Sequence, residues 1–526
     1  MKVAEHADVV ILGGGLAGLT LALQLRRQDS PPDITVIERS EIPPPAAAHK
    51  VGESTVEIGA HYLSQELKLE GLLEDTQLRK FGLRFFFGSG QQADLSGADE
   101  LGASELLPVP SYQLDRGLLE GDLARIAAEQ GIRVVSGSVV KSVELATDGK
   151  SHRVNFRNGA EAGSIRCKWV VDAASRAAIL KRQMGLKKNS PHSINAAWFR
   201  LDHAEDIDSW SSNQSWKKRT DPGRRLSTNH LMGSGYWVWL IPLAGDRTSV
   251  GIVADPERHP LEGFQDFQRC LQWLGEHQPH CAEVVAGQAG ELMDFRFLKH
   301  FSHDSVRLWS PDRWALTGEA GVFADPFYSP GSDFIAISNT FIAQLIKQNQ
   351  QGQNIRIESQ IFEQLYKSFY ANTMSIYQDL YAGFGDTRLM VLKTTWDYAY
   401  YWGVLALLYY RRAITDVWLM KELEPVLLRL QQVNRAIQAR FRERAMRGKE
   451  DLGSGRFFDQ CQIPVLVQMN GELLESGPSV QKELGRNAHR LENLAAQLQT
   501  ELDGGTSVPG PNCELLGDLR YRLSGG

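Results

Sequence analysis

The chain has 526 residues, a formal net charge of −6 at pH 7 and 42% hydrophobic residues. This length is enough for two or three domains with sizeable cores. The acidic balance and the lack of a long basic run argue against a nucleic-acid-binding protein. Five widely spaced cysteines without a C-x-x-C pair argue against a disulfide scaffold and a zinc site. We therefore expect no bound metal and a cytoplasmic location.

Neither end of the chain predicts insertion into a membrane. The first eight residues are polar and partly acidic, unlike a signal peptide. The longest apolar stretch near the other end, residues 402–410, is too short to cross a bilayer. We therefore expect no transmembrane segment.

The segment "ADVVILGGGLAGLTLALQLRR" predicts a strand, a tight turn and a helix. Residues 9–12 form the short buried strand, and Gly13, Gly15 and Gly18 follow the pattern G-x-G-x-x-G. A second predicted strand, "ITVIER", brings Glu38 about 20 residues after the glycines. The glycines let the backbone approach a pyrophosphate at the helix N-terminus, and the acidic side chain accepts a ribose hydroxyl. This combination predicts a dinucleotide site in a Rossmann-like domain.

Residues 235–242, "GYWVWLIP", predict a buried strand. Alternation along a strand places Trp237, Trp239 and Ile241 on one face, and the opposite face is apolar as well. Pro242 lacks an N–H and marks the end of the strand or an edge. Taken alone, this pattern indicates an ordinary core strand.

Two later segments resemble aromatic-hydroxylase-type flavoproteins, which favours FAD over NAD. In "PSYQLDRGLLEGDLARIAAEQGIRVVSG", Arg116 precedes a predicted helix and a strand. "WVVDAASRAAIL" resembles the D-A-S/T-G-R segment of those proteins through Asp172 and Ala173. It departs from that segment at Ala174 and Ser175, which replace the usual hydroxyl residue and glycine.

A third segment, "RWALTGEAGVFADPFYSPGSDF", resembles the late G-D-A-x-x-x-x-D-P motif. In those flavoproteins this motif contacts the ribityl chain and the ring of the flavin. Asp325 and Pro326 match the motif, whereas Glu319 stands where the family usually has Asp. A carboxylate is kept, one methylene longer, so the resemblance implies a rearranged ribityl contact.

Together, the glycine turn, W-x-W-x-I-P and D-P followed by S-P-G resemble the flavin-dependent halogenases over roughly residues 5–345. W-x-W-x-I-P is the most specific of these motifs. In the family it lies beside the flavin and is thought to discourage direct monooxygenation. The resemblance implies an α/β fold: a FAD-binding Rossmann-like domain with a mixed β-sheet substrate region and a helical C-terminal region. The implied cofactor is FAD, used as FADH2.

The resemblance also implies a set of cofactor-binding residues. "KVGEST" is similar to the V-G-E-x-T segment that lies near the isoalloxazine. The full predicted set is Gly13, Gly15, Ala17, Gly18, Glu38, Arg39, Lys50, Val51, Gly52, Glu53, Ser54, Arg116, Asp172, Ala173, Glu319, Asp325 and Pro326.

Halogenase chemistry needs a reactive lysine, and Lys80 fits the K-x-G-x-x-F context of the phenol-type and carrier-type members. An amine in an apolar setting can accept Cl⁺ as a chloramine or hold HOCl by a hydrogen bond. Burial helps the chloramine form if it lowers the pKa of the amine. Two alternatives stay open: Lys80 is an ordinary solvated surface charge, or Lys50 carries the role.

The resemblance places a chloride or bromide ion at the loop formed by Ser329, Pro330, Gly331 and Ser332, although an ordinary tight turn is the alternative. Tryptophan halogenases carry a glutamate just before this loop, and this chain has Tyr328 there. A free-tryptophan substrate is therefore not expected, and a phenol or pyrrole fits better.

From about residue 355 the chain becomes helical and aromatic. We expect a core over residues 1–350, with the β-sheet region at about 180–310, and a helical region over 351–526. The helices pack on the flavin domain, cover a large apolar substrate pocket, or present a surface to a carrier protein or membrane. Residues 481–502 predict a charged amphipathic helix, and residues 89–104 and 503–512 are the most loop-like.

The predicted activity is that of a two-component halogenase in secondary metabolism. FADH2 comes from a separate flavin reductase, because a second dinucleotide motif is not found. Oxygen and halide give hypohalous acid, and the lysine passes the halogen to a small electron-rich aromatic, free or carrier-bound. A flavin monooxygenase on the same scaffold is the first alternative. A flavin-binding protein without turnover is the second.

Overall fold

The computed structural model describes residues 5–44, 51–147, 149–503, 516 and 519. The chain forms two compact units, each built from three segments. Unit 1 comprises Met1–Gln77, Leu114–Ser190 and Ser302–Ala371, and unit 2 comprises Leu78–Gln113, Pro191–Phe301 and Asn372–Gly526. This division differs from the predicted one at residue 350, because the chain passes between the units repeatedly. Most of the predicted β-sheet region shares unit 2 with the C-terminal helices.

Unit 1 is built on a largely parallel sheet, in which β1 pairs in parallel with both β2 and β10. In spatial order its strands are β18 (Trp309–Ser310), β19 (Trp314–Leu316), β10 (Glu161–Asp172), β1 (His6–Leu12), β2 (Ile34–Ile37) and β7 (Arg133–Val135), with β9 (His152–Asn158) and β8 (Ser138–Glu144) branching from β10. The central strands read "VVIL" and "ITVI" and are buried, as expected when both faces of a parallel sheet are covered. A separate two-stranded sheet pairs β11 (Lys187–Asn189) with β17 (His303–Ser305).

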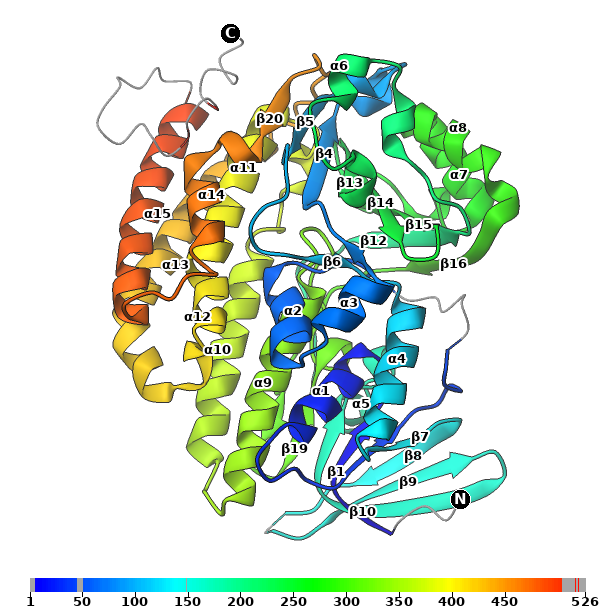
Figure 1. The fold of residues 1–526 in the computed structure, drawn as a ribbon, viewed down its shortest axis with the longest axis vertical. Coiled ribbons are helices and arrows are strands. Elements are labelled where there is room, and N and C mark those ends of the chain that lie inside the picture. The colour runs from blue at the N-terminus through cyan, green and yellow to red at the C-terminus, as the bar shows by residue number, and fades with distance from the viewer. Residues whose placement is uncertain (1–4, 45–50, 148, 504–515, 517–518, 520–526) are drawn as a thin grey trace. The chain divides into compact units, whose positions relative to one another are not determined.

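The helices of unit 1 begin with α1, which confirms the predicted strand, turn and helix at the N-terminal end. Figure 1 shows α1 beside α4 above the start of the parallel sheet. The helices are α1 (Leu16–Arg26), α2 (Glu57–His61), α3 (Glu70–Thr76), α4 (Arg116–Glu129), α5 (Ile179–Gln183), α9 (Gly331–Gln350) and most of α10 (Arg356–Met374).

Unit 2 contains a mixed sheet, as the resemblance implied. Its strands in spatial order are β16 (Leu292–Leu298), β12 (Asn195–Leu201), β15 (Arg247–Ala254), β14 (Tyr236–Leu243), β13 (Thr228–Gly233), β4 (Leu83–Phe87), β5 (Asp99–Gly102) and β20 (Phe457–Asp459). The pairs β13–β4 and β5–β20 are parallel and the others are antiparallel. A short sheet of β3 (Leu78–Arg79) and β6 (Tyr112–Gln113) completes the strands described in this unit.

The tryptophan strand is β14, and all eight of its residues are buried. It lies between β13 and β15 in the sheet, so Pro242 does not mark an edge. Pro242 is opposite Thr248, and the strand continues only to Leu243. Its position one residue before the strand end agrees with the missing N–H donor.

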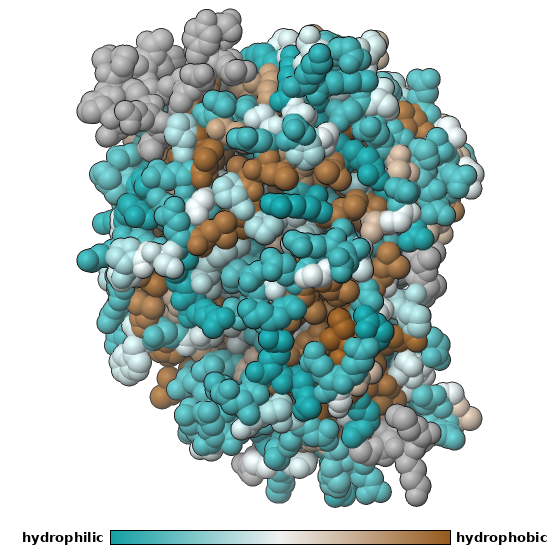
Figure 2. Space-filling model, in the orientation of Figure 1, coloured by the Kyte–Doolittle hydropathy of each residue, from teal (hydrophilic) through white to brown (hydrophobic). Residues whose placement is uncertain are grey.

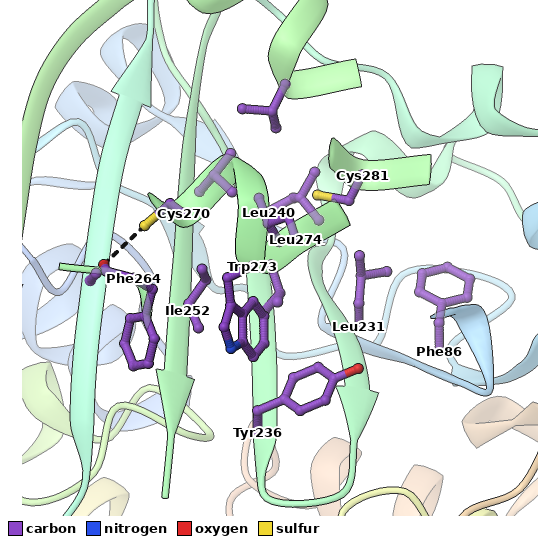
Figure 3. Packing of buried hydrophobic residues seen from close by; sticks show 14 of the residues in the cluster. Phe86, Leu231, Tyr236, Leu240, Ile252, Phe264, Cys270, Trp273, Leu274 and Cys281 are labelled. Carbon is purple, nitrogen blue, oxygen red and sulfur yellow. Dashed lines mark hydrogen bonds between the residues drawn. The ribbon is translucent and has the colours of Figure 1, made fainter. Parts of the chain in front are cut away.

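One face of this sheet packs against α7 (Phe267–His277) and α8 (Pro279–Gly287), which form a hydrophobic cluster with it. Figure 3 shows Trp273 of α7 and Tyr236 of β14 packed ring against ring, and their centroids are 4.8 Å apart in an edge-on arrangement. Tyr236, Val238 and Leu240 all belong to this cluster, so the predicted alternation of β14 holds. The two tryptophans of the strand face the other way.

The stretch 89–104, predicted as a loop, contains β5. Glu100 of β5 is fully buried and pairs with both Arg84 and Arg224, the latter at 2.7 Å between Oε1 and Nε. A polar segment is thus part of a sheet because its charges are matched inside the protein. Of the other predicted loop, 503–512, only residue 503 lies within the described residues.

The C-terminal part of unit 2 is helical, as predicted. Its helices are α11 (Thr387–Tyr400), α12 (Leu407–Tyr410), α13 (Val417–Ala445), α14 (Pro464–Gly471) and α15 (Val480–Leu502), and a short α6 (Gln214–Lys217) lies earlier in the unit. Helix α15 matches the predicted amphipathic helix and packs on α13. Among the residues placed in the structure, no helix has the length and apolar character needed to cross a membrane. The face drawn in Figure 2 is mostly hydrophilic, with hydrophobic residues in separate small groups.

Candidate functional site

The glycine turn after β1 contains glycines of two kinds. Gly13 has φ +110°, and a Cβ there would lie 2.5 Å from the carbonyl oxygen of Ala173. A Cβ on Gly18 would lie 2.0 Å from the carbonyl oxygen of Gly13, so packing of the chain on itself requires both glycines. A Cβ on Gly15 would meet only the Glu120 carboxylate, at an ordinary 3.7 Å. Packing of the chain on itself therefore does not require a glycine at Gly15, at the N-terminus of α1, which fits a position where a ligand approaches the backbone closely.

Glu38 lies beside this turn, at the end of β2. Its two carboxylate oxygens accept hydrogen bonds from the backbone N–H groups of Gly14, at 2.7 Å, and Ser40, at 2.8 Å. These bonds fix the carboxylate, and its remaining lone pairs can accept a ribose hydroxyl. Arg39 is exposed next to it, and Lys50 lies outside the described residues.

Arg116, the first residue of α4, joins three of the predicted cofactor segments. Its Nη1 donates to the carbonyl oxygens of Val51, at 2.8 Å, and Gly52, at 3.3 Å. Its Nε donates to Glu120 Oε1 at 3.1 Å, and the same oxygen accepts the backbone N–H of Leu16 at 3.2 Å. The pair thus links the segment after Lys50 to the start of α1. The sequence analysis missed Glu120, whose only signal is its spacing four residues after an arginine.

Glu53 and Ser54 are buried, and the Glu53 carbonyl accepts the backbone N–H of Leu114 at 2.7 Å. The Ala17 carbonyl accepts a hydrogen bond from Asn339 Nδ2 of α9 at 3.1 Å. Asn339 is a second residue that the sequence analysis missed. The signal for it is a short polar run, Ser338 to Thr340, within a largely apolar part of α9, "FIAISNTFIAQLI".

Asp172, at the end of β10, organises the loop that follows it. Its Oδ1 accepts the backbone N–H of Ala174 at 3.0 Å, and its Oδ2 accepts that of Leu180 at 2.7 Å. Burial raises the pKa of this carboxyl to about 6. These contacts make Asp172 a support for the loop, and its predicted contact with the cofactor stays a prediction. Ala173 donates its N–H to the Leu12 carbonyl at 2.8 Å, beside Gly13.

The two departures from the family motifs meet in space. Ser175 Oγ donates a hydrogen bond to Glu319 Oε2 at 2.5 Å. Arg176 Nε lies 3.9 Å from the same oxygen. The Glu319 carboxylate is therefore positioned by Ser175 and Arg176, in the segment that contains the other departure from the family motifs.

The loop before α9 is conformationally strained. Asp325 is buried, and its Oδ1 accepts the backbone N–H of Phe327 at 2.9 Å. Ser329 donates its N–H to the Pro326 carbonyl at 2.8 Å. Tyr328 and Ser329 have φ values of +66° and +58°, in the left-handed region that L-residues rarely adopt. Consecutive strained residues of this kind are concentrated at functional sites.

This loop ends at the N-terminus of α9, which begins at Gly331 after Pro330. The first-turn N–H groups of a helix have no partner within the helix itself, so the N-terminus of this 20-residue helix is suited to bind an anion. The Ser332 hydroxyl, in contrast, is buried, because a Cβ on Gly59 would lie only 2.2 Å from its Oγ. The predicted halide contact of this loop, including Ser332, stays a prediction.

Lys80, in unit 2, lies in the link between β3 and β4. Its residue is only 3% exposed, so the alternative of a solvated surface charge is wrong. The link is held by backbone hydrogen bonds from Lys80 to Ser111, at 2.8 Å, and from Phe81 to Leu226, at 2.8 Å. Gly82 has φ +71° with open space around its missing Cβ, so the glycine of K-x-G-x-x-F serves the backbone turn.

The phenylalanine of the same motif packs on a histidine. Phe85 of β4 and His230 of β13 are stacked, with centroids 4.7 Å apart and ring planes 23° apart. His230 Nδ1 is hydrogen-bonded to the Arg84 carbonyl at 3.0 Å. Burial, together with the nearby charge of Lys80, lowers the pKa of His230 to about 3. His230 is therefore a neutral neighbour of Lys80, and the sequence analysis missed it.

Both signature tryptophans lie on the side of β14 that faces His230. The rings of Trp237 and His230 are 5.3 Å apart, and those of Trp237 and Trp239 are 5.6 Å apart. Trp237 Nε1 donates to the Tyr381 hydroxyl at 3.1 Å, and Trp239 Nε1 donates to Ser249 Oγ at 3.1 Å. Unit 2 thus gathers the lysine, two tryptophans, a histidine and a tyrosine from elements far apart in the sequence. We call these residues (Lys80, Phe85, His230, Trp237, Trp239 and Tyr381) the lysine cluster.

Comparison with known proteins identifies the family. The family model described as tryptophan halogenase matches residues 8–95 and 98–381. The chain belongs to the flavin-dependent halogenase family. A flavin-dependent halogenase of Dictyostelium discoideum is 28% identical over 380 residues, covering 66% of this chain and 61% of the relative. This chain therefore matches less than two thirds of that relative's length.

A second relative is the 1H-pyrrole-2-carbonyl-[peptidyl-carrier protein] chlorinase of Pseudomonas fluorescens. It is 25% identical over 355 residues, covering 64% of this chain and 74% of the relative. Among solved structures, halogenase PltM in complex with phloroglucinol and FAD superimposes with a TM-score of 0.65 and 16% identity, covering 98% of both chains. The match to PltM includes the C-terminal helices, so the fold of the whole chain has a halogenase counterpart.

Proposed function

We propose that this protein is an FADH2-dependent halogenase that uses oxygen and chloride or bromide to halogenate an electron-rich aromatic ring through Lys80. The observation that carries the proposal is the burial of Lys80 in the lysine cluster, in a chain that belongs to the halogenase family. Lysine is rarely buried without a specific reason. A buried amine can hold an electrophilic halogen away from water until it reaches the substrate.

FAD fits unit 1 because packing of the chain on itself requires Gly13 and Gly18 but not Gly15, which leaves the close approach of a ligand as the reason for that glycine. The N-terminus of α1 would hold the pyrophosphate, and Glu38 would hold the ribose. When bound, reduced flavin supplies the two electrons and the oxygen activation that hypohalous acid formation requires. The N-terminus of α9 would hold the halide, through the backbone around Ser329 and Gly331.

The proposed substrate is a phenol-like or pyrrole-like ring, free or carrier-bound. Tyr328 occupies the position at which tryptophan halogenases carry a glutamate, so a substrate that activates its own ring is favoured. The Pseudomonas fluorescens relative is named for a pyrrole on a carrier protein, and PltM was solved with phloroglucinol. Both names agree with a small electron-rich ring.

The deciding experiment is mass spectrometry of reactions with FADH2, oxygen, bromide and a panel of phenols, pyrroles, indoles and carrier-bound acyl groups. We expect a brominated phenol or pyrrole. Hydroxylated product that forms equally well without halide would instead support a flavin monooxygenase. That second candidate is favoured by Pro330, which removes one N–H donor from the N-terminus of α9.

We further propose that a separate reductase supplies FADH2, because the sequence carries a single dinucleotide motif. NADPH alone should leave the bound flavin oxidised on the timescale of turnover, and adding a flavin reductase should restore reduction. Stopped-flow absorbance of the flavin band measures both rates. Rapid bleaching by NADPH without a reductase would reject the two-component arrangement and favour a self-sufficient monooxygenase.

A further inference from the structure

Ser175 adopts a backbone conformation that its side chain disfavours. It begins a short 3-10 turn, Ser175–Ala177, with φ +49°. Related flavoproteins carry glycine at this position, which fits the left-handed backbone without strain. The structure retains a serine here although glycine would be the easier residue. Strain of this kind is expected where the side chain has a use.

The hydroxyl of Ser175 is used to hold Glu319. Glu319 lies in the turn Gly318–Ala320, and its side chain is 23% exposed. The contact at 2.5 Å is made to Oε2, which also faces Arg176. The Arg176 guanidinium lies over the Phe323 ring at 5.5 Å, which fixes the other neighbour of the carboxylate.

The turn that carries Glu319 lies against the nucleotide end of unit 1. A Cβ on Gly318 would lie 2.9 Å from the Cβ of Ala17, in the first turn of α1. The turn that carries Glu319 is thus packed against the first turn of α1, the helix whose N-cap is Gly15. Glutamate has one more rotatable bond than aspartate, so an unanchored Glu319 would sample more orientations and lose more entropy on binding a ligand.

We propose that Ser175 is a positioning residue that aims the Glu319 carboxylate at the polyol chain of the bound flavin. Ser175 holds Oε2, and Oε1 then accepts a hydrogen bond from a hydroxyl of the cofactor. The two departures from the family motifs thus act together. The longer side chain of Glu319 needs the hydrogen bond from Ser175 to fix it, and this hydrogen bond accounts for a serine at a position with a strained backbone. This inference rests on the proposed flavin site of unit 1.

The test measures FAD affinity and thermal stability together. Ser175→Gly removes the anchor and relieves the strain, and Ser175→Ala removes the anchor and keeps the strain. Both variants should bind FAD about 10-fold more weakly, the loss of one hydrogen bond to a charged group. The melting temperature of ligand-free Ser175→Gly should stay within about 4 °C of the unmodified protein. Quenching of flavin fluorescence gives the affinities.

The control is the Glu319→Asp background, whose shorter side chain does not reach Ser175. In this background, Ser175→Gly should change FAD affinity less than about 2-fold. The effect of Ser175→Gly would then be about 5-fold or more larger with Glu319 than with aspartate, which measures the coupling of the two positions. Equal losses in both backgrounds, or unmodified FAD affinity in Ser175→Gly and Ser175→Ala, would overturn the inference. If the unmodified protein itself fails to bind FAD, the proposed flavin site is wrong and the inference falls with it.

Discussion

The candidate sites of the two units are encoded differently in the amino-acid sequence. In unit 1 the cofactor residues belong to short contiguous motifs, because a nucleotide is held mainly by backbone N–H groups and helix termini. In unit 2 the lysine cluster is assembled from β4, β13, β14 and residues near position 381. Side chains that act together there come into contact through sheet register. A motif search therefore finds the first kind of site directly and the second kind only through one of its members.

The largest expected effect comes from removing Lys80. The proposal makes this residue essential for halogen transfer in unit 2 and unnecessary for the flavin site of unit 1. Lys80→Ala should reduce halogenated product by at least about 100-fold, because the group that holds the halogen next to the substrate is lost. Oxygen consumption should continue, with release of peroxide or free hypohalous acid. Product is measured by mass spectrometry and oxygen by an electrode.

Two further variants test the assignment of Lys80. Lys80→Arg should also fail, because a guanidinium stays protonated and offers no amine lone pair. Lys50→Ala is the control and should retain product. Normal halogenation by Lys80→Ala together with loss in Lys50→Ala would move the role to Lys50. Normal halogenated product in both variants would show that neither lysine transfers the halogen.

An effect of similar size is expected in unit 1 from Gly15→Val. The structure leaves ordinary space for a Cβ at this position, so the ligand-free fold should survive. FAD affinity should fall by at least about 100-fold, since the side chain displaces the pyrophosphate from charge-assisted N–H contacts. Titration calorimetry measures the affinity.

Two glycine controls show whether the loss in Gly15→Val is specific. Gly71→Ala, where a Cβ meets nothing within 4 Å, should bind FAD normally. Gly18→Val should unfold unit 1, because its Cβ would collide with the Gly13 carbonyl. Unchanged affinity in Gly15→Val would remove the basis of the nucleotide site.

The sequence was enough to predict the strand, turn and helix at Gly13, the buried tryptophan strand and the helix at 481–502. Each of these depends on local periodicity or on a backbone requirement. It was not enough to predict β5, because Glu100 is stabilised by arginines brought from elsewhere in the fold. The division into two units was missed for the same reason: it follows from long-range pairing that leaves no local signal.

Within the candidate site, the same distinction holds residue by residue. Gly15, Glu38 and Lys80 were found because they stand in motifs with defined spacing. His230 was missed because nothing near it in the sequence marks it, and Glu120 because its spacing after Arg116 is its only signal. Their positions depend on register with β4 and on the helix turn after Arg116. The contact between Ser175 and Glu319 was visible only as two separate departures from family motifs.

The smallest expected effect compares the two units through one histidine in each, buried in unit 2 and partly buried in unit 1. Burial, with a nearby lysine charge, lowers the pKa of both His230 in unit 2 and His303 in unit 1 to about 3. In the unfolded chain each histidine binds a proton near pH 6.5, whereas in the folded state it stays neutral down to about pH 3. The free energy of unfolding therefore falls as the pH drops from about 6.5 to about 3. Between pH 8 and pH 5 each histidine should contribute a loss of about 2 kcal/mol in the free energy of unfolding.

His230→Phe and His303→Phe should each flatten this pH dependence, and the exposed His6→Gln should leave it unchanged. Urea denaturation at pH 8 and pH 5 gives the total, and hydrogen exchange assigns the change to one unit. His230→Phe should protect the amides of β4 and β13 at pH 5, since those strands hold its ring. Protection that appears instead in the parallel sheet of unit 1 would show that the two units unfold together. The two sites would then differ only in how the sequence encodes them.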